Sequence, residues 1–291
     1  MDTVAPAATE ATDRWVARVV LATCALLVVL SLGRALLGLT VFAGTDVLYE
    51  VPPWSAQATP GFAPQNPYVG DPTDGTYPQA AEFAARLRGG DVASWSSLSP
   101  GGSELGTTAG SRLLSPLSLP YLLLPGSLAP GFVKLLELVV AIGGTFLFAR
   151  RIGLGRAAGL LGGLAFATSG FLIAWTSWPQ AAVASLVPAL FWALERLLQS
   201  RTGRDVGVVA LVVAALLLSG FPSVVVYALY AALPYVLVRL VILERWSPRR
   251  VAGGAALVAA GIGGGILVAA GPLLALVHQL GDVQLGSRLQ G

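Results

Sequence analysis

Charged residues are scarce in this chain. Of its 291 residues only 11% are Asp, Glu, Lys or Arg, whereas 55% are hydrophobic. Ordinary soluble domains carry roughly 25% charged residues, and a surface much poorer in charge would not stay hydrated. The mean hydropathy of +0.74 agrees with this reasoning. The composition therefore excludes an ordinary soluble enzyme and indicates a protein that lies in a lipid bilayer.

Metal-binding and disulfide-forming side chains are almost missing as well. The chain has a single cysteine, Cys24, and a single histidine, His278. One cysteine cannot form an intramolecular disulfide, and one cysteine with one histidine makes a zinc site of the usual kind implausible. The net charge of +3 is small and argues against a nucleic-acid partner. We predict neither a zinc site nor bound nucleic acid.

Long apolar runs are abundant instead. A bilayer core takes about 20 mainly apolar residues per helix, and seven runs reach or approach that length. They lie near residues 15–39, 131–149, 157–175, 180–198, 206–220, 223–243 and 251–277. The sequence therefore predicts an all-α polytopic membrane protein with about seven transmembrane helices and a large external first loop.

This pattern divides the chain into five parts. We expect a cytoplasmic tail at 1–14, the first transmembrane helix at 15–43, an external loop with interfacial helices at 44–130, a six-helix bundle at 131–277 and an external end at 278–291. An odd number of spans and an end without a polar tail lead us to expect that the last part is truncated.

The positions of the arginines predict the orientation. If the N-terminus is inside, every short inside loop is basic and no short outside loop is, as the positive-inside rule requires. The basic residues that then fall inside are Arg14, Arg18, Arg150, Arg151, Arg156, Arg196, Arg201, Arg204, Arg239, Arg245, Arg249 and Arg250. We expect a multi-pass protein of the bacterial inner (plasma) membrane with a cytoplasmic N-terminus and the long loop outside.

The long loop is too extended to be a simple connector, and its many aromatic residues indicate that it folds. Residues 77–87 predict an amphipathic helix with Ala80, Phe83 and Ala84 on its apolar face. Residues 113–124 are apolar but contain two prolines and are too short to span a bilayer. Both segments are typical of chain that lies on a membrane surface.

Three acidic residues of this loop are candidate catalytic groups. Asp46 follows the first apolar run directly, and Asp71 and Asp74 lie in the turn-rich segment Gly70-Asp71-Pro72-Thr73-Asp74-Gly75. A carboxylate at the membrane surface can act as general base toward an acceptor hydroxyl, or it can bind a divalent cation that neutralises a phosphate. The alternative is that these acids are turn residues whose side chains bond nearby backbone N–H groups.

Basic residues expected near the outer surface are candidates for binding a donor phosphate: Arg112, Lys134, Arg288 and His278. A guanidinium group can contact a phosphate through two parallel hydrogen bonds. Two alternatives stay open. Lys134 and Glu137 lie one helical turn apart and can neutralise each other, and a lone histidine at an interface is more often structural.

Three aromatic residues of the loop are candidates for binding sugar or acceptor: Trp54, Trp95 and Tyr77. The two indole rings offer a flat face on which a sugar can stack. Packing in the core of the loop explains the tryptophans equally well.

Several short motifs follow one another in a familiar order. They are Asp46-Val47-Leu48, Pro52-Pro53-Trp54, Asn66-Pro67, Gly70-Asp71-Pro72, Tyr77-Pro78, Ser115-Pro116, Phe148-Ala149-Arg150-Arg151-Ile152-Gly153-Leu154, Ser169-Gly170-Phe171, Gly220-Phe221-Pro222 and Ser287-Arg288. In this order they resemble the YfhO-like bacterial membrane proteins, which belong with the GT-C class of glycosyltransferases. Members of that family are usually much longer, so the resemblance is to their N-terminal part.

The resemblance implies an activity. Such enzymes take a sugar from a polyprenyl-phosphate donor and pass it to a cell-envelope acceptor outside the cytoplasm, using an acidic residue of the first external loop. Asp46 occupies the position just after the first helix where such enzymes typically keep that acid, and Asp71 matches the aspartate of the Asp-Pro segment. Cofactors are not implied with certainty, and a divalent cation stays an alternative.

Two other functions compete with the transferase. The first is a transporter or flippase of a lipid-linked sugar, and the second is a non-enzymatic scaffold of the cell envelope. Transporters usually place ionisable residues or broken helices near the middle of the membrane. The middles of the apolar runs lack charge, although Pro188 and Pro234 can break helices. This pattern favours chemistry at the surface over translocation.

Overall fold

The computed structural model describes residues 6–65, 70–91, 95–98, 101–105, 112–244 and 247–280. Within these residues helices predominate. The strands among them are limited to one short antiparallel pair, β1 (Trp95–Ser96) with β2 (Ser103–Glu104). The predicted all-α class is therefore confirmed.

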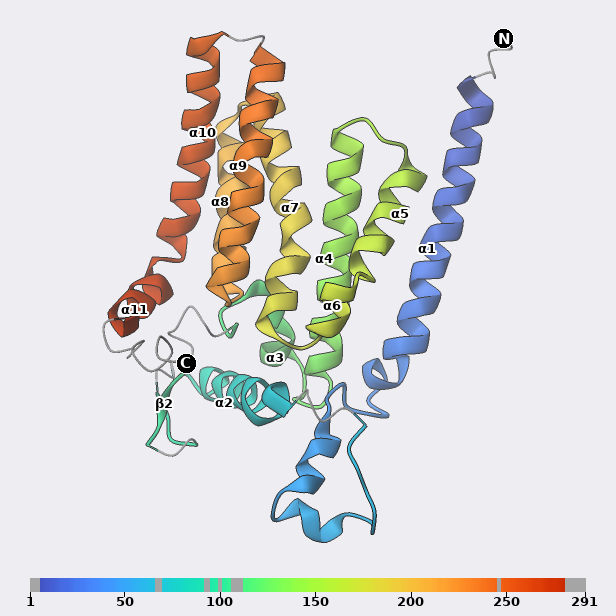
Figure 1. Cartoon of the computed structure of the whole chain (residues 1–291), viewed down its shortest axis with the longest axis vertical. Helices are drawn as coiled ribbons and strands as arrows, with labels where there is room; N and C mark the ends of the chain where they lie inside the picture. Colours follow the sequence, from blue (N-terminus) through green and yellow to red (C-terminus); the bar gives the residue numbers. More distant parts are fainter. Residues whose placement is uncertain are drawn as a thin grey trace, which may run out of the picture.

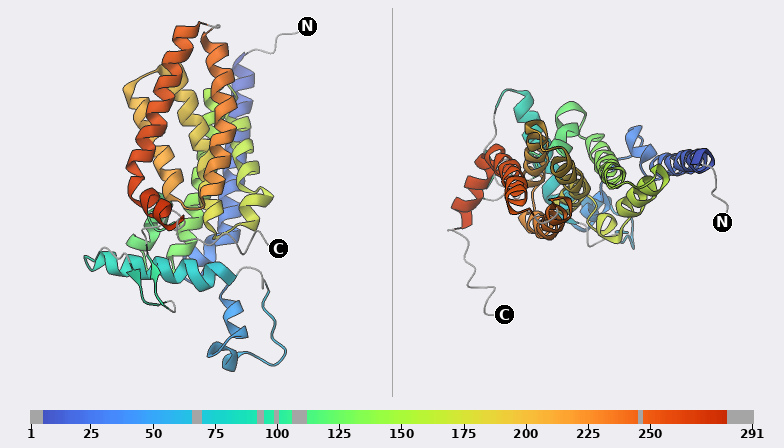
Figure 2. Two further views of the ribbon diagram at one scale, coloured as in Figure 1. Left: turned by 60° about the vertical axis from the view of Figure 1, so that its left-hand side comes forward. Right: turned by 90° about the horizontal axis from the view of Figure 1, so that it is seen from above.

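The long helices stand side by side (Figure 1). They are α1 (Pro6–Leu36), α4 (Ala129–Arg151), α5 (Arg156–Ala167), α7 (Pro179–Ser200), α8 (Gly203–Leu218), α9 (Pro222–Glu244) and α10 (Pro248–Val268). Seen from above, α1 stands at one edge of this row and α10 at the other (Figure 2). Two shorter helices, α6 (Gly170–Ala174) and α11 (Ala270–Leu280), continue from α5 and α10.

Five of the described helices are long and apolar enough to cross a membrane: α1 from Glu10 onward, α4, α7, α9 up to Leu243, and α10. They identify a multi-pass membrane protein. The other two upright helices are shorter, with 12 residues in α5 and 16 in α8. The count of seven spans therefore stays a prediction.

Two apolar runs that the sequence predicted as continuous helices are broken. The run 157–175 divides at Ser169, whose backbone is extended, into α5 and α6. The run 251–277 divides at Ala269 into α10 and α11, and α11 turns away from the bundle axis (Figure 1). Hydropathy reports only the apolar character of a run and does not detect such breaks. The first break lies beside the hydroxyl residue Thr168. The second lies just before Pro272, and proline is favoured in the first turn of a helix.

The two internal prolines have the opposite outcome. The helices α7 and α9 continue through Pro188 and Pro234, so neither proline breaks its helix. Neighbouring helices can compensate for the hydrogen bond that a proline removes from a membrane helix.

Small residues allow the helices to pack closely. A Cβ atom on Gly144 of α4 would lie 2.8 Å from the backbone nitrogen of Ala189 in α7, and one on Gly265 of α10 would lie 2.6 Å from Val213 in α8. Glycine at such points lets two helix backbones approach each other. The largest buried cluster then forms between α7, α8 and α9 around Leu190 and Leu240.

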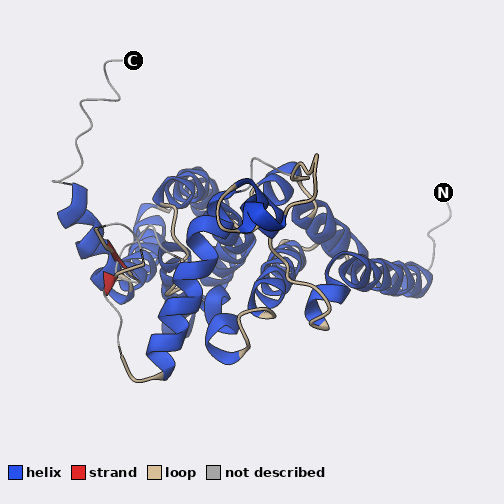
Figure 3. Cartoon of the chain, turned by 90° about the horizontal axis from the view of Figure 1, so that it is seen from below, coloured by secondary structure: helices blue, strands red, loops and turns tan. Residues whose placement is uncertain are grey.

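The described part of the connection between α1 and α4 forms a separate layer at one end of the bundle (Figure 1), which we call the α2 layer after its main element, α2 (Tyr77–Arg88). This helix lies across that end, as the view from below shows (Figure 3). The apolar face predicted for this helix is confirmed, because Ala80, Phe83 and Ala84 are buried in one cluster with Tyr121 and Val133. The short elements η4 (Pro116–Ser118) and α3 (Leu119–Leu123) supply the other side of that contact. A segment with η1 (Thr45–Glu50) and η2 (Trp54–Gln57) extends away from the bundle (Figure 1).

Candidate functional site

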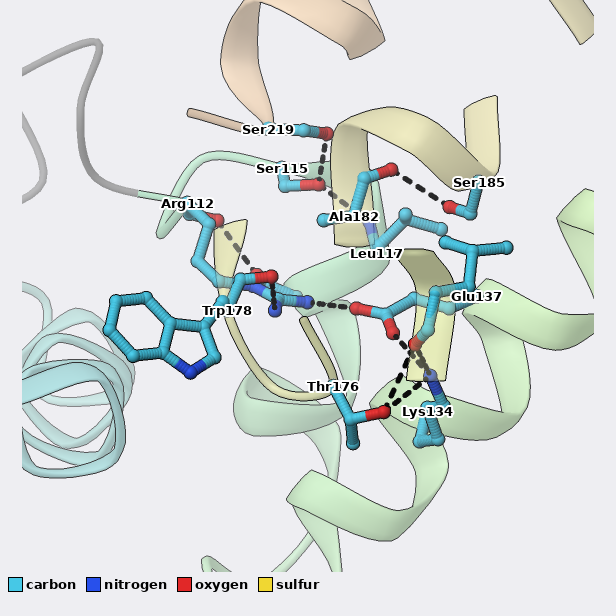
Figure 4. Close-up of polar contacts among 12 residues, drawn as sticks. Arg112, Ser115, Leu117, Lys134, Glu137, Thr176, Trp178, Ala182, Ser185 and Ser219 are labelled. Carbon is cyan, nitrogen blue, oxygen red and sulfur yellow. Dashed lines mark hydrogen bonds and ion pairs between the residues drawn. The ribbon is translucent and has the colours of Figure 1, made fainter. Parts of the chain in front are cut away.

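A buried cluster of charges lies where the α2 layer meets the bundle (Figure 4). Arg112 comes just before η4, and Lys134 and Glu137 lie in the first turns of α4. The Nη2 atom of Arg112 donates a hydrogen bond of 2.7 Å to Oε1 of Glu137, and these side chains are only 4% and 3% exposed. The Nη1 atom of Arg112 donates to the carbonyl oxygen of Trp178 at 3.4 Å. This pair therefore joins the α2 layer, α4 and the start of α7.

Lys134 completes the cluster. Its Nζ atom lies 3.7 Å from Oε2 of Glu137 and donates to the carbonyl oxygen of Leu172 at 3.2 Å and to Oγ1 of Thr176 at 3.3 Å. The predicted Lys134–Glu137 ion pair is present, but the short contact of the carboxylate goes to Arg112. Two cations thus face one carboxylate. The cluster carries an excess positive charge.

Two polar atoms of this cluster have no hydrogen-bond partner within the described residues. They are Nε of Arg112 and Oε2 of Glu137. Buried polar atoms in folded proteins are nearly always hydrogen-bonded, so two orphans in one place need an explanation. Both residues line a small cavity together with Tyr77, Tyr121 and Lys134. The cavity has a volume of about 10 Å³, which is enough for about one water molecule.

Two tyrosines close this cavity from the α2 layer. The hydroxyl of Tyr77 donates to the carbonyl oxygen of Phe42 at 3.2 Å, and Tyr121 is buried in α3. Burial raises the pKa of the Tyr77 hydroxyl, although nearby Ser177 and Arg112 oppose the shift. Burial also raises the pKa of Tyr121 well above its usual range. Both hydroxyls therefore stay protonated and can donate hydrogen bonds at neutral pH.

A larger cavity adjoins this cluster. It has a volume of about 470 Å³ and lies between the chain after α1, residues 72–77 and the end of α6 with the residues that follow it. Its lining residues are Val41, Phe42, Ala43, Gly44, Pro72, Tyr77, Ile173, Ala174, Thr176 and Ser177. Hydrogen bonds hold its walls together, since Thr73 Oγ1 donates to the carbonyl oxygen of Gly44 at 3.1 Å. We call it the head cavity.

An apolar groove continues from the head cavity into the bundle. It has a volume of about 270 Å³, and most of its lining comes from apolar residues of α1, α4 and α5, such as Leu27, Ile142 and Leu164. It shares Phe42, Ile173 and Thr176 with the head cavity. Lys134 also lines this groove. Its Nζ atom donates to Thr176, which lines both spaces. A cation therefore lies beside the junction of the head cavity and the apolar groove, an arrangement suited to an amphiphile with an anionic head.

The three predicted catalytic acids do not line the cavities of this site. Oδ2 of Asp46 accepts a hydrogen bond of 2.8 Å from the backbone N–H of Gln65, which closes the segment that extends from the bundle. Asp71 and Asp74 are exposed. Each acid is nevertheless close in sequence to a lining residue, with Asp46 two residues after Gly44 and Asp71 directly before Pro72.

The turn predicted around Asp71 and Asp74 is wrong. Residues 70–71 are helical, and Pro72–Thr76 form a π-helical turn, η3, that runs directly into α2. Pro72 occupies the first position of that turn, where a proline costs no hydrogen bond. The two aspartates are therefore displayed from a helix, where they do not cap a turn.

Of the remaining predicted residues that the structure describes, only Tyr77 is brought to the cluster. Trp54 and Trp95 are 43% and 53% exposed, so core packing does not explain them, and neither lines the head cavity. His278 is exposed on α11. Arg288 lies outside the described residues. Of the three predicted phosphate ligands within the described residues, Arg112 and Lys134 come together and His278 does not.

Sequence reasoning gave too little weight to Glu137, which holds both cations. It also missed Tyr121 and the Thr176–Ser177 turn. The available signal was a carboxylate that lies, together with Lys134, in an apolar helical run, because charged residues in membrane helices almost always have a partner.

No cation site is assigned. Within the described parts of the chain, no three residues among His, Cys, Asp and Glu come together as metal ligands. A divalent cation therefore has no structural support at this site.

Comparison with known proteins gives no relative. No protein-family model, no curated protein and no solved structure matches this chain. The resemblance to YfhO-like proteins thus stays a prediction that rests on short motifs.

Proposed function

We propose that this chain is a membrane glycosyltransferase, or its donor-binding module, that takes a sugar from a polyprenyl-phosphate donor and passes it to a cell-envelope acceptor. One observation carries the proposal: Lys134 lines the apolar groove and donates a hydrogen bond to Thr176, a residue that the groove shares with the head cavity. A polyprenyl chain fits the groove, its phosphate pairs with the ammonium group, and its sugar occupies the cavity. The proposal includes seven spans in the bacterial inner membrane, a cytoplasmic N-terminus and an external α2 layer.

The residues divide into two roles under this proposal. Lys134 meets the phosphate and stabilises the charge that develops on it as the sugar departs. Arg112 is paired with Glu137 at 2.7 Å, so it positions Glu137 and does not contact the phosphate itself. The acceptor hydroxyl loses its proton to a carboxylate beside the head cavity, Asp46 or Asp71, with Asp74 as the third candidate.

The test is transfer of labelled sugar from polyprenyl-phosphate donors in membranes that contain the full chain. Asp46→Asn, Asp71→Asn and Asp74→Asn are compared with Asp91→Asn, a control that removes an exposed loop acid paired with Arg86. Loss of transfer in one of the three variants, with normal folding and retained donor binding, supports the enzyme and identifies its base.

Two other outcomes have clear meanings. Donor binding that requires Lys134 but leads to no transfer would favour the donor module, or a flippase that moves the lipid-linked sugar. If the chain neither binds the donor nor transfers the sugar, the proposal is contradicted and the non-enzymatic scaffold becomes the favoured function.

A further inference from the structure

A second group of cations lies at the opposite end of the bundle, between α1 and α5. The N-terminus of α5 is fixed beside α1 because Asp13 accepts hydrogen bonds from the backbone N–H groups of Arg156 and Ala157, both at 2.9 Å. This contact sets Arg156 beside the arginines of α1. Figure 1 shows α5 leaning against α1 in this region.

The two helices enclose a hollow of about 260 Å³ there. Its lining residues are Arg14, Ala17, Arg18, Leu21, Arg156 and Leu160. Arg14, Arg18 and Leu21 follow one another at helical spacing and share one face of α1, and Arg156 and Leu160 do the same on α5. On both helices the arginines lie nearer the end of the bundle and the leucine lies deeper. We call this site the arginine hollow.

The charges of the arginine hollow are poorly compensated. Both carboxylate oxygens of Asp13 are engaged by backbone N–H groups. Glu10 lies 3.5 Å from Arg14, but both side chains are at least half exposed, and such surface pairs contribute little. Asp13 keeps its negative charge and interacts with Arg156, so one carboxylate and the exposed Glu10 face three arginines, and within the described residues no ion pair joins Arg18 to a carboxylate. Positive charge therefore gathers around an apolar floor.

We propose that the arginine hollow binds an anionic phospholipid of the surrounding bilayer. Guanidinium groups form paired hydrogen bonds with phosphate oxygens. The order of the lining, cations first and leucines deeper, matches the order of phosphate and acyl chain in a phospholipid. A zwitterionic lipid adds a positive charge of its own next to three arginines and fits less well. Basic pockets between membrane helices are known to select anionic head groups in this way.

The general excess of arginine at one end of a membrane protein is the competing explanation, since such arginines face the lipid head groups without forming a site. The two explanations differ in one respect. A site depends on the particular arginines that share the hollow, whereas a general field depends only on their number.

The experiment counts lipids bound to the purified full chain by native mass spectrometry. Phosphatidylglycerol is compared with phosphatidylcholine of identical acyl chains. The variant Arg18→Gln/Arg156→Gln is compared with Arg204→Gln/Arg249→Gln, which removes the same charge from exposed arginines at the N-termini of α8 and α10. Circular dichroism and thermal unfolding confirm that all three proteins are folded.

The wild type and the control are expected to retain phosphatidylglycerol in preference to phosphatidylcholine. Each arginine removed from the hollow should weaken phosphatidylglycerol binding about five-fold, the usual contribution of one basic residue at an anionic surface. Glycerol 3-phosphate, which has the head phosphate but no acyl chains, should not displace the lipid. An equal loss in the control variant, equal retention of phosphatidylcholine, or displacement by glycerol 3-phosphate would overturn the proposal.

Discussion

The two ends of the bundle each bury a glutamate beside an arginine, yet the two pairs differ. Near the C-terminal end of α7, Glu195 is 0% exposed. It accepts hydrogen bonds of 2.6 Å from the Tyr235 hydroxyl and from Gln199 Nε2, and it also accepts from Arg239. Near the start of α4, Glu137 is bonded to Arg112 through one oxygen, and its other oxygen has no hydrogen-bond partner among the described residues.

The difference separates a structural contact from a candidate site. A fully satisfied buried network fixes the positions of the helices that contribute to it, and the Glu195 network does so for α7 and α9. The Glu137 network is incomplete and adjoins two cavities and a second cation, Lys134. Its unsatisfied atoms leave hydrogen bonds available for a ligand or a water molecule.

The largest expected effect on stability comes from Glu195→Ala. This change leaves Arg239, whose side chain is 24% exposed, and the half-buried Tyr235 without their shared acceptor, so the free energy of unfolding should fall by about 3 kcal/mol, the lower end of the cost for a fully buried pair. Unfolding in detergent micelles measures it, with Glu50→Ala, an exposed acid of η1, as control. A change below ~1 kcal/mol would mean that the network does not hold α7 to α9.

The next largest effect is expected between the two networks, at the contact of α4 with α7. Gly144→Ala places a methyl group 2.8 Å from the backbone nitrogen of Ala189, which forces the helices apart and should cost about 1–3 kcal/mol. Gly143→Ala is the matched control, because a Cβ atom there has nothing within 4 Å. Equal stabilities of the two variants would show that this close approach is not required.

An alkaline effect is expected at the α2 end. Because burial raises the pKa of Tyr121, the folded state keeps a proton that the unfolded state loses above about pH 10. The stabilising contribution is therefore complete below that pH and is lost as the pH rises further. Unfolding midpoints between about pH 8 and about pH 11 should fall less steeply for Tyr121→Phe than for the wild type. The exposed Tyr49→Phe should behave like the wild type, and identical slopes in all three proteins would refute this explanation.

The smallest effect on stability is expected from Lys134→Met, combined with a large effect on binding. The change removes the excess buried cation but leaves the Arg112–Glu137 pair intact, so stability should change by less than ~1 kcal/mol. Binding of a polyprenyl-phosphate donor should be lost, because the groove then has no cation at its polar end. Arg88→Met, which removes an exposed cation from α2, should preserve binding. If Lys134→Met is destabilised but still binds the donor, then Lys134 has a structural role and not the binding role assigned to it.

Several elements were predictable because their signals are local. The apolar face of α2 follows from helical spacing over 77–87, and the long apolar runs follow from composition alone. The breaks at Ser169 and Ala269 were not predicted, because they depend on local backbone geometry within runs that remain apolar throughout. The helical turn at Pro72–Thr76 was missed for a related reason: its Asp, Pro and Gly residues are typical of turns, and the adjacent α2 extends the helix through them.

The candidate site was only partly predictable. Arg112 and Lys134 were identified as cations near one surface, but the partner of Arg112 is Glu137, 25 positions away along the chain. The predicted acids Asp46 and Asp71 are close in sequence to residues that line the head cavity, but they do not line it themselves. No pattern in a single sequence states which of many charged residues will meet across a bundle.

The sequence by itself determined that this protein lies in a membrane, that it is helical and that its arginines gather in particular segments. These properties follow from the free-energy cost of placing polar groups in hydrocarbon. Each membrane segment has to avoid that cost by itself, so the signal is present in each segment's own sequence. Only the tertiary structure decided that Glu137 holds two cations, that Lys134 stands at the mouth of an apolar groove and that Arg18 and Arg156 share a hollow. The physical reason is that these contacts depend on the spacing and rotation of packed helices, which small residues such as Gly144 set and which no single segment contains.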